Sequence, residues 1–165
     1  MATAEILYTD TEMQIAVHRN LLLIAFCDAP SAEQIRECGR VARSLARKHP
    51  GGIGLLNLVL SGKPNFTNEM REEAVKLNRD PSLFRLAIAD VVLIPGLVGV
   101  AARSFLSTVT LLSRSANPRS AFGNLEDTDA WLVPRLAGGG GERWARGDIV
   151  AVSQPIVTAR RRVKA

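Results

Sequence analysis

The run Ile53–Leu60 constrains the fold more than any other segment, because it is apolar at every position except Gly54 and Asn57. A strand with one solvent face alternates apolar and polar residues, whereas a strand covered on both faces is apolar almost throughout, as in parallel sheets. Leu86–Ile94 has the same character and ends at Pro95 and Gly96. We therefore predict two central strands of a sheet that is covered on both faces.

The segments around these runs predict further strands and helices. Ser31 and Gln34 form a capping box, in which each side chain satisfies a free backbone amide near the start of a helix. Apolar residues then recur at helical spacing. The other strands expected are Ile6–Tyr8, Met13–Val17, Leu21–Phe26 and Arg119–Phe122. The helices expected run from Ser31 to about His49, from Thr67 to about Asp80, over Leu97–Leu112, and through Trp131 to Leu136.

The resulting order is β-β-β-α-β-α-β-α-β-α, which predicts an α/β fold with a mixed, largely parallel sheet and helices packed on it. We place one domain at residues 1–137 and a Gly linker with a basic, flexible C-terminal tail at 138–165. Within the tail, Asp148–Val157 is expected to pair as an edge strand or to stay loose. Ala159–Ala165 is expected to be disordered.

The net charge of +5 resides mostly in this tail. Residues 138–165 hold six basic and two acidic side chains, which leaves the rest of the chain close to neutral. The cluster Arg160, Arg161, Arg162 and Lys164 can attract nucleic acid or an anionic membrane surface. No aromatic residue lies within the cluster, so base stacking is not indicated. The alternative is a solvated chain end.

The sequence predicts a cytoplasmic protein. Its start lacks the basic and apolar regions of a signal peptide. The longest apolar stretch, 86–102, is interrupted by Asp90 and Pro95, whereas a membrane helix needs about 20 predominantly apolar residues. Cys27 and Cys38 are isolated, as expected for reduced and buried thiols.

No pattern for catalysis is found in the sequence. Residues 61–64, Ser-Gly-Lys-Pro, follow a predicted strand but lack the spacing of a phosphate-binding loop. His18 and His49 are the only histidines, and neither belongs to a metal-ligand or nucleophile motif. We therefore predict a non-enzymatic protein with no cofactor and no metal.

The turn from Ser61 to Thr67 is the remaining candidate site. A phosphate on either hydroxyl would meet the positive end of the following helix, which suits a regulatory switch. The alternative is structural, with Thr67 capping that helix and Ser61 ending the strand.

The element order, the strand Leu55–Leu60, the polar turn after it, and the closing segments 121–127 and 130–132 together resemble the STAS-like families. In particular they are similar to SpoIIAA-like proteins, which are related to anti-sigma factor antagonists. The resemblance covers about residues 5–137. It implies a bacterial protein–protein interaction module without catalysis, in which Ser61 or Thr67 is the phosphoacceptor. The partner-binding residues it implies are Ser61, Lys63, Asn65, Phe66, Met70 and Arg71.

Two alternatives remain at this level. The apolar helix expected over Leu97–Leu112 should be deeply packed and could line a site for a small apolar ligand or lipid. The tail could instead dock the domain onto a larger assembly. The sequence leaves the identity of a regulatory partner and the oligomeric state open.

Overall fold

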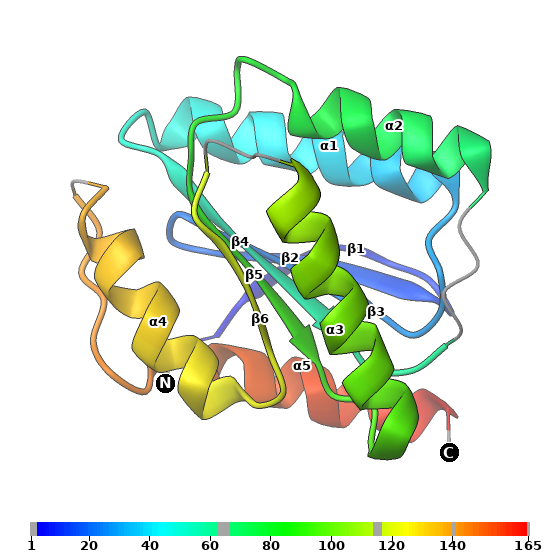
Figure 1. Cartoon of the computed structure of the whole chain (residues 1–165). Helices are drawn as coiled ribbons and strands as arrows, with labels where there is room; N and C mark the ends of the chain where they lie inside the picture. Colours follow the sequence, from blue (N-terminus) through cyan, green and yellow to red (C-terminus); the bar gives the residue numbers. More distant parts are fainter. Residues whose placement is uncertain (1–2, 63–66, 114–116, 140, 165) are drawn as a thin grey trace.

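The computed structural model describes residues 3–62, 67–113, 117–139 and 141–164, with the side chains of 105–113 and of Lys164 outside the description. Six strands form one sheet in sequence order (Figure 1). They are β1 (Glu5–Thr9), β2 (Met13–His18), β3 (Leu21–Phe26), β4 (Ile53–Val59), β5 (Arg85–Val92) and β6 (Arg119–Phe122). The helices are α1 (Ala32–Lys48), α2 (Asn68–Asn78), α3 (Gly96–Ser113), α4 (Leu125–Ala137) and α5 (Asp148–Lys164).

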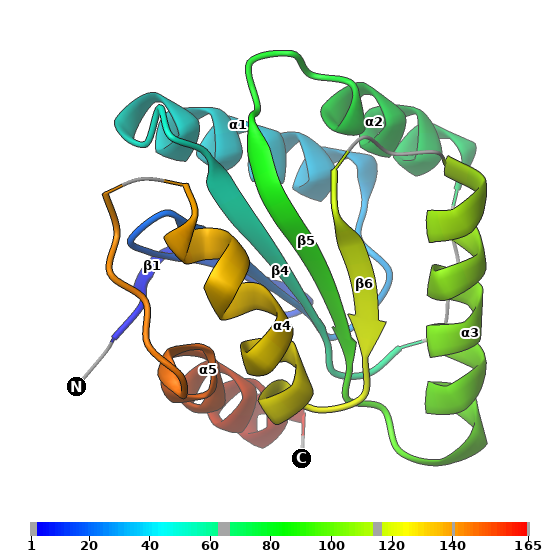
Figure 2. The same cartoon turned by 60° about the vertical axis from the view of Figure 1, so that its left-hand side comes forward.

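The predicted mixed sheet is confirmed. The pairs β1–β2 and β2–β3 are antiparallel, and from β3 to β6 every neighbouring pair is parallel. The apolar runs that predicted central strands are β4 and β5, which pair with each other in the interior of the sheet. Helices α1 and α2 lie over one face, α4 and α5 lie over the other, and α3 runs along β6 (Figure 2).

The face under α1 is packed by the buried stripe that its sequence predicts. The capping box is present, with the Ser31 hydroxyl accepting from the Gln34 amide at 3.1 Å and the Gln34 side chain accepting from the Ser31 amide at 2.9 Å. Because apolar positions of α1 repeat every three or four residues, one side of the helix meets the sheet. The residues of this core are Met13, Ile15, Leu22, Ile24, Cys38, Val41, Ala42, Leu45, Ile53 and Leu83.

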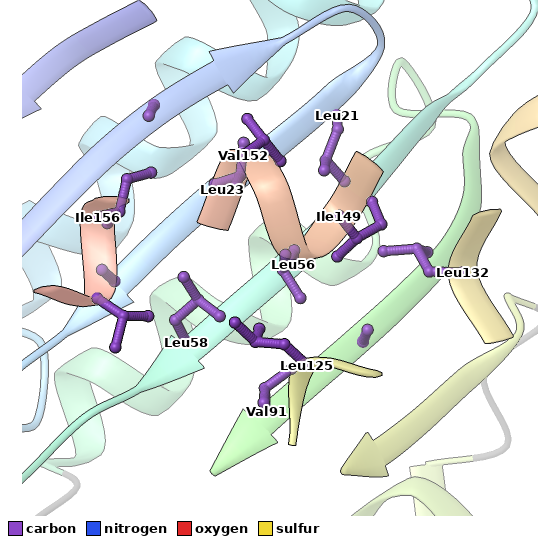
Figure 3. Packing of buried hydrophobic residues seen from close by; sticks show 14 of the residues in the cluster. Leu21, Leu23, Leu56, Leu58, Val91, Leu125, Leu132, Ile149, Val152 and Ile156 are labelled. Atoms are coloured by element: carbon purple, nitrogen blue, oxygen red, sulfur yellow. The ribbon is translucent and has the colours of Figure 1, made fainter. Parts of the chain in front are cut away.

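The opposite face carries the larger core, which α4 and α5 complete (Figure 3). Alternate residues of β3, β4 and β5 point to this side, since side chains alternate along a strand. From α4 come Leu125, Leu132 and Leu136, and from α5 come Ile149, Val152, Ile156 and Val157. Figure 3 shows Ile149, Val152 and Ile156 directed toward Leu21, Leu23, Leu56 and Leu58.

The structure corrects the expectation for the C-terminal segment. Asp148–Val157 is neither an edge strand nor loose, because it forms most of α5, and a flexible tail over 138–165 is not confirmed. The physical reason is the spacing of its apolar residues. Ile149, Val152 and Ile156 lie three and four residues apart, so a helix brings them to one face, which is fully covered by the sheet. This segment therefore belongs to the same core as residues 1–137.

The start of α5 is fixed by a buried carboxylate from α4. Asp129 accepts hydrogen bonds from the backbone amides of Gly147 at 2.8 Å and of Ile149 at 2.9 Å. The first amides of a helix have no partner within the helix, so this carboxylate satisfies them and favours the positive end of the helix dipole.

Arg160 fixes the other end of α5. Its side chain is 4% exposed, and its guanidinium donates to the carbonyl oxygens of Asp10 at 2.7 Å and of Thr11 at 2.9 Å. These carbonyls belong to the turn between β1 and β2. The first arginine of the predicted cluster 160–164 is therefore part of the tertiary structure, in contrast to Arg161 and Arg162, which are exposed.

Among the described residues, no helix has both the length and the apolar character needed to cross a membrane. This agrees with the sequence analysis of the stretch 86–102.

Replacing Arg160 with methionine should lower the free energy of unfolding by about 2 kcal/mol, because two hydrogen bonds from a charged donor are lost. Arg162→Met, the matched control on the exposed side of α5, should change it by less than about 0.5 kcal/mol. Urea unfolding followed by circular dichroism measures both. Equal effects of the two substitutions would contradict the role given to Arg160.

Candidate functional site

The sequence-predicted turn lies where the parallel strands end. Backbone bonds from Leu60 to Phe26 and from Leu93 to Val59, both 2.8 Å, hold the ends of β3, β4 and β5 together. We define residues 27–28, 60–62 and 93–100 as the carboxyl edge. In α/β sheets, binding sites form at this edge because the loops there can vary while the strands stay fixed.

Ser61 has a structural role at the carboxyl edge. Its hydroxyl donates to the Cys27 carbonyl at 2.7 Å, which ties the turn after β4 to the turn after β3. Gly62 follows with a φ of +103°, and a Cβ there would lie 2.7 Å from the Cα of Asp28. The backbones of the two turns therefore approach so closely that only glycine fits.

Thr67 and Met70 also take positions that stabilise the fold. Thr67 is the N-cap of α2, and its hydroxyl oxygen accepts from the Met70 amide at 3.2 Å. The Thr67 side chain is exposed, whereas Met70 is 6% exposed, so Met70 is not available to a partner on this surface. Arg71 is exposed. The other three predicted partner-binding residues, Lys63, Asn65 and Phe66, lie outside the described residues.

Charged groups connect α1 with α2 and the residues just after it, in addition to the packing of Leu77 against the α1-side core. Arg36 lies 3.7 Å from Glu69 and 3.5 Å from Glu73, and Arg43 lies 3.0 Å from Asp80. The hydrogen bond from Lys76 is the main reason that the pKa of Glu73 is lowered. Such exposed ion pairs contribute little to stability.

The outer side of α2 is a solvent-facing mixture of charged and apolar groups. We define the α2 outer face as Arg71, Glu72, Val75 and Arg79, all of which are exposed. Val75 is 46% exposed and lies between the charged residues of this face.

The start of α3 differs from expectation. Leu97, which should have been deeply packed, is 87% exposed, and Val98 and Val100 are 57% and 50% exposed. Ala101 is exposed as well. The first turn of this helix extends beyond the strand ends, so these side chains have no sheet beneath them. They form an apolar patch at the carboxyl edge, and nothing in the sequence pattern distinguished them from a buried stripe.

Two regions that the sequence analysis treated separately meet at this edge. The Arg161 guanidinium donates to the carbonyl of Leu93 at 3.3 Å, three residues before α3 begins. The end of α5 therefore reaches the edge that also carries Ser61. Of the predicted basic cluster, Arg160 points inward, and Arg161 and Arg162 remain exposed.

The sequence analysis did not identify a buried polar cluster on the α1 side of the sheet. Asp90 on β5 is 3% exposed and accepts from Arg119 on β6, with Nε–Oδ2 at 2.7 Å and Nη2–Oδ1 at 3.1 Å. Asn57 on β4 donates to the same carboxylate at 2.8 Å. The signal was visible, because Asn57 and Asp90 are the polar interruptions of the two apolar runs. The Asp90 carboxylate is paired with the Arg119 guanidinium, and the cluster links β4, β5 and β6.

A second polar group lies in a hollow of about 520 Å³ at the start of α1. The Asp10 carboxylate accepts from the Tyr8 hydroxyl at 2.6 Å, the Gln34 amide at 2.8 Å and the backbone amides of Glu12 and Met13, both at 2.7 Å. Burial alone would raise the pKa of Asp10, but these four hydrogen bonds outweigh it and lower the pKa to about 2. The carboxylate is saturated and acts as the core of the β1–β2 turn.

Comparison of the chain with protein-family models, with curated proteins and with solved structures gave no match. Within the described part of the chain, no group of three or more His, Cys, Asp or Glu side chains could hold a metal ion.

For the buried pair of Asp90 and Arg119, we predict that removing one charge lowers stability more than removing both charges. Arg119→Met should cost about 3 kcal/mol of unfolding free energy, because it leaves the Asp90 charge buried without its cation. The double variant Asp90→Leu/Arg119→Met should be more stable than this single variant, since no charge remains in the interior. Denaturant unfolding measures the unfolding free energies of the single and the double variant. A double variant that is less stable than the single one would refute the prediction.

From the low pKa of Asp10 we predict that the free energy of unfolding falls at acidic pH. Its folded pKa lies below its ordinary value of 3.8, so it stabilises the fold above that pH and loses this contribution as the pH falls toward about 2. Asp10→Asn should be less stable at neutral pH and should lack this part of the acid transition. Unfolding free energies measured from pH 7 to pH 2 test this, and parallel curves for the two proteins would contradict it.

Proposed function

We propose that the chain is a non-enzymatic interaction module of STAS-like type, which binds a regulatory protein partner in bacterial partner switching. The observation that supports this proposal best is the α2 outer face. It places an exposed aliphatic side chain among charges of both signs, next to the turn that the sequence resemblance implies as a binding region.

The composition of the α2 outer face suits a reversible contact. Non-obligate interfaces are about as polar as the rest of a protein surface, with arginine enriched at their centres. Arg71, Val75 and Arg79 recur four residues apart, so they form one stripe along the helix. The carboxylate of Glu72 beside this stripe adds a group that can select for a basic residue on the partner.

Of the two proposed phosphoacceptors, Thr67 is the better one. The Ser61 hydroxyl donates its proton to the Cys27 carbonyl, so a phosphate there would break a contact between two turns. The exposed Thr67 hydroxyl accepts a hydrogen bond, and a phosphate on it could take over the same role at the start of α2. Phosphate at this position would add negative charge beside the α2 outer face and change its affinity for a partner.

The test is capture of partners from host lysate on the full chain. Arg71→Glu/Val75→Asp should abolish retention of a specific protein, whereas Arg47→Glu/Phe84→Asp should retain it. The control pair is matched in type and lies outside the α2 outer face, at the amino ends of β4 and β5, where Arg47 and Phe84 are both exposed.

Quantitative mass spectrometry of the eluates measures retention, and circular dichroism confirms that both variants are folded. Equal capture by the two double variants would refute the α2 outer face as the binding surface. Thr67→Glu should change the captured amount more than Ser44→Glu, a half-buried hydroxyl position within α1.

A further inference from the structure

The two edges of the sheet differ in their cover. Strand β6 ends the sheet on one side, and α3 runs along it, whereas β1 ends the sheet on the other side and pairs only with β2. Figure 2 shows the two strands at opposite borders of the molecule. Four of the five side chains of β1 are exposed, and that of Tyr8 is half-buried. The helices on the two faces therefore leave β1 largely uncovered.

The open edge of β1 is suited to pairing with another strand. Alternate residues of an edge strand direct their backbone N–H and C=O groups away from the sheet, and natural edge strands are often protected by lysine or proline. Strand β1 contains no Lys, Arg or Pro. Its register shifts between Ile6 and Tyr8, which leaves Leu7 without a partner on β2. Ile6 is 55% exposed and Leu7 is 42% exposed, so the middle of the open edge is apolar.

One side of α1 flanks the open edge. The hollow at the start of this helix is lined by Tyr8 of β1 and, among others, by Glu33, Glu37 and Arg40 of α1. Arg47 follows Arg40 by two helical turns and therefore lies on the same side of the helix. We call this side of α1, with Glu33, Glu37, Arg40 and Arg47, the β1-facing side. Its charges lie beside any chain that pairs with β1.

The charge along the β1-facing side changes sign from one end of the helix to the other. The end near the β1–β2 turn is acidic, and the end near the start of β1 is mainly basic. The charged residues are Asp10, Glu12, Glu33 and Glu37 at the acidic end, and Arg40, Arg47, Lys48 and Glu5 at the basic end. The other two arginines of α1 that could alter this balance, Arg36 and Arg43, pair with carboxylates of α2 and of the residues just after it. The arginines at the end of α5 belong to the helix that covers the opposite face of the sheet.

We propose that two copies of the chain pair through β1, antiparallel and about a two-fold axis, so that their sheets join into one. Ile6 and Leu7 lie in the middle of the strand, so the axis brings them next to the same residues of the second copy. A two-fold contact requires a surface that is complementary to itself. The axis also turns the acidic end of one α1 toward the basic end of the other, so Glu33 faces Arg47 of the second copy. This inference does not depend on the proposed function of the α2 outer face.

A second copy fits these observations better than a strand from another protein does. A foreign strand would satisfy the free backbone groups of β1, but it would need its own charges in the order that complements α1. The chain supplies that order itself, because one helix carries both signs at opposite ends. Since α3 runs along β6, the joined sheet has no second open edge, and pairing stops at two copies.

The first experiment measures the mass of the full chain by analytical ultracentrifugation over a range of concentrations. The original chain should pass from monomer to dimer as its concentration rises. Ile6→Lys/Leu7→Lys should raise the dissociation constant more than about tenfold, because it places like charges in the middle of the paired edges. The matched control Val98→Lys/Val100→Lys introduces two lysines at exposed aliphatic positions of α3 and should leave the dissociation constant unchanged. Circular dichroism confirms that both variants are folded.

The second experiment reverses charges to test the antiparallel arrangement. Glu33→Lys and Arg47→Glu each place like charges opposite one another twice in a symmetric dimer, so each should raise the dissociation constant about fivefold. The double variant Glu33→Lys/Arg47→Glu restores opposite charges and should return the dissociation constant to its original value. Within one copy the two residues lie about 21 Å apart along α1, so restoration reports a contact between copies. A double variant that dimerises more weakly than either single variant would overturn the antiparallel arrangement.

The third experiment locates the contact by amide hydrogen exchange. The amides of residues 5–9 should exchange more slowly in the dimer than in the monomer, because strand pairing provides acceptors for those that face away from β2. The amides of residues 71–79 in α2 should exchange at the same rate in both. Equal exchange of residues 5–9 in monomer and dimer would overturn the role of β1.

Two further results would overturn the proposal. One is a chain that stays monomeric at about millimolar concentration. The other is a dimer that Ile6→Lys/Leu7→Lys leaves intact, or a β1 edge that is protected only by a strand of another protein. Loss of partner capture by the α2 variants with the dimer intact would leave the proposal standing, so this proposal and the proposed function can fail separately.

Discussion

Closure of the second face of the sheet by α5 is the constraint on which the rest of the structure depends. Ile149, Val152, Ile156 and Val157 cover strands whose residues on that side are almost all apolar, and each buried side chain contributes about 2 kcal/mol. That sum is comparable to the whole stability of a typical domain. The helix is held at both ends by polar contacts, from Asp129 at its start and from Arg160 to the β1–β2 turn at its end. The segment leading into it is also fixed, since Trp144 donates to Asn20 at 2.8 Å.

The sequence predicted most of the fold because its strands and first helices carry strong local signals. The unbroken apolar runs of β4 and β5 identify central strands, and the Ser31–Gln34 capping box marks the start of α1. The C-terminal helix was missed for a physical reason. Its segment is rich in β-branched residues and contains Pro155, both of which argue against a helix, and tertiary packing overrides these local preferences. The helical spacing of Ile149, Val152 and Ile156 was the signal that could have revealed it.

The candidate site was less predictable, because exposure depends on neighbours that are distant in sequence. Leu97 and Met70 are both apolar residues on predicted helices, yet one is exposed at a helix tip and the other is buried. Arg160 and Arg161 are adjacent, but one is enclosed and the other reaches the strand ends. A sequence pattern places such residues on an element without showing what that element meets. The structure instead distinguishes two exposed surfaces on different helices, the α2 outer face and the start of α3.

The central claim is that residues 1–137 do not form an independent domain without α5. A chain that ends at Ala137 tests this directly, with its unfolding followed by circular dichroism and its apolar surface by binding of a hydrophobic dye. Without α5 the side chains of Leu21, Leu23 and Leu56 lose their cover, so the account predicts strong dye binding and no cooperative unfolding transition. A shortened chain that unfolds cooperatively, with the stability of the full chain and without dye binding, would contradict it.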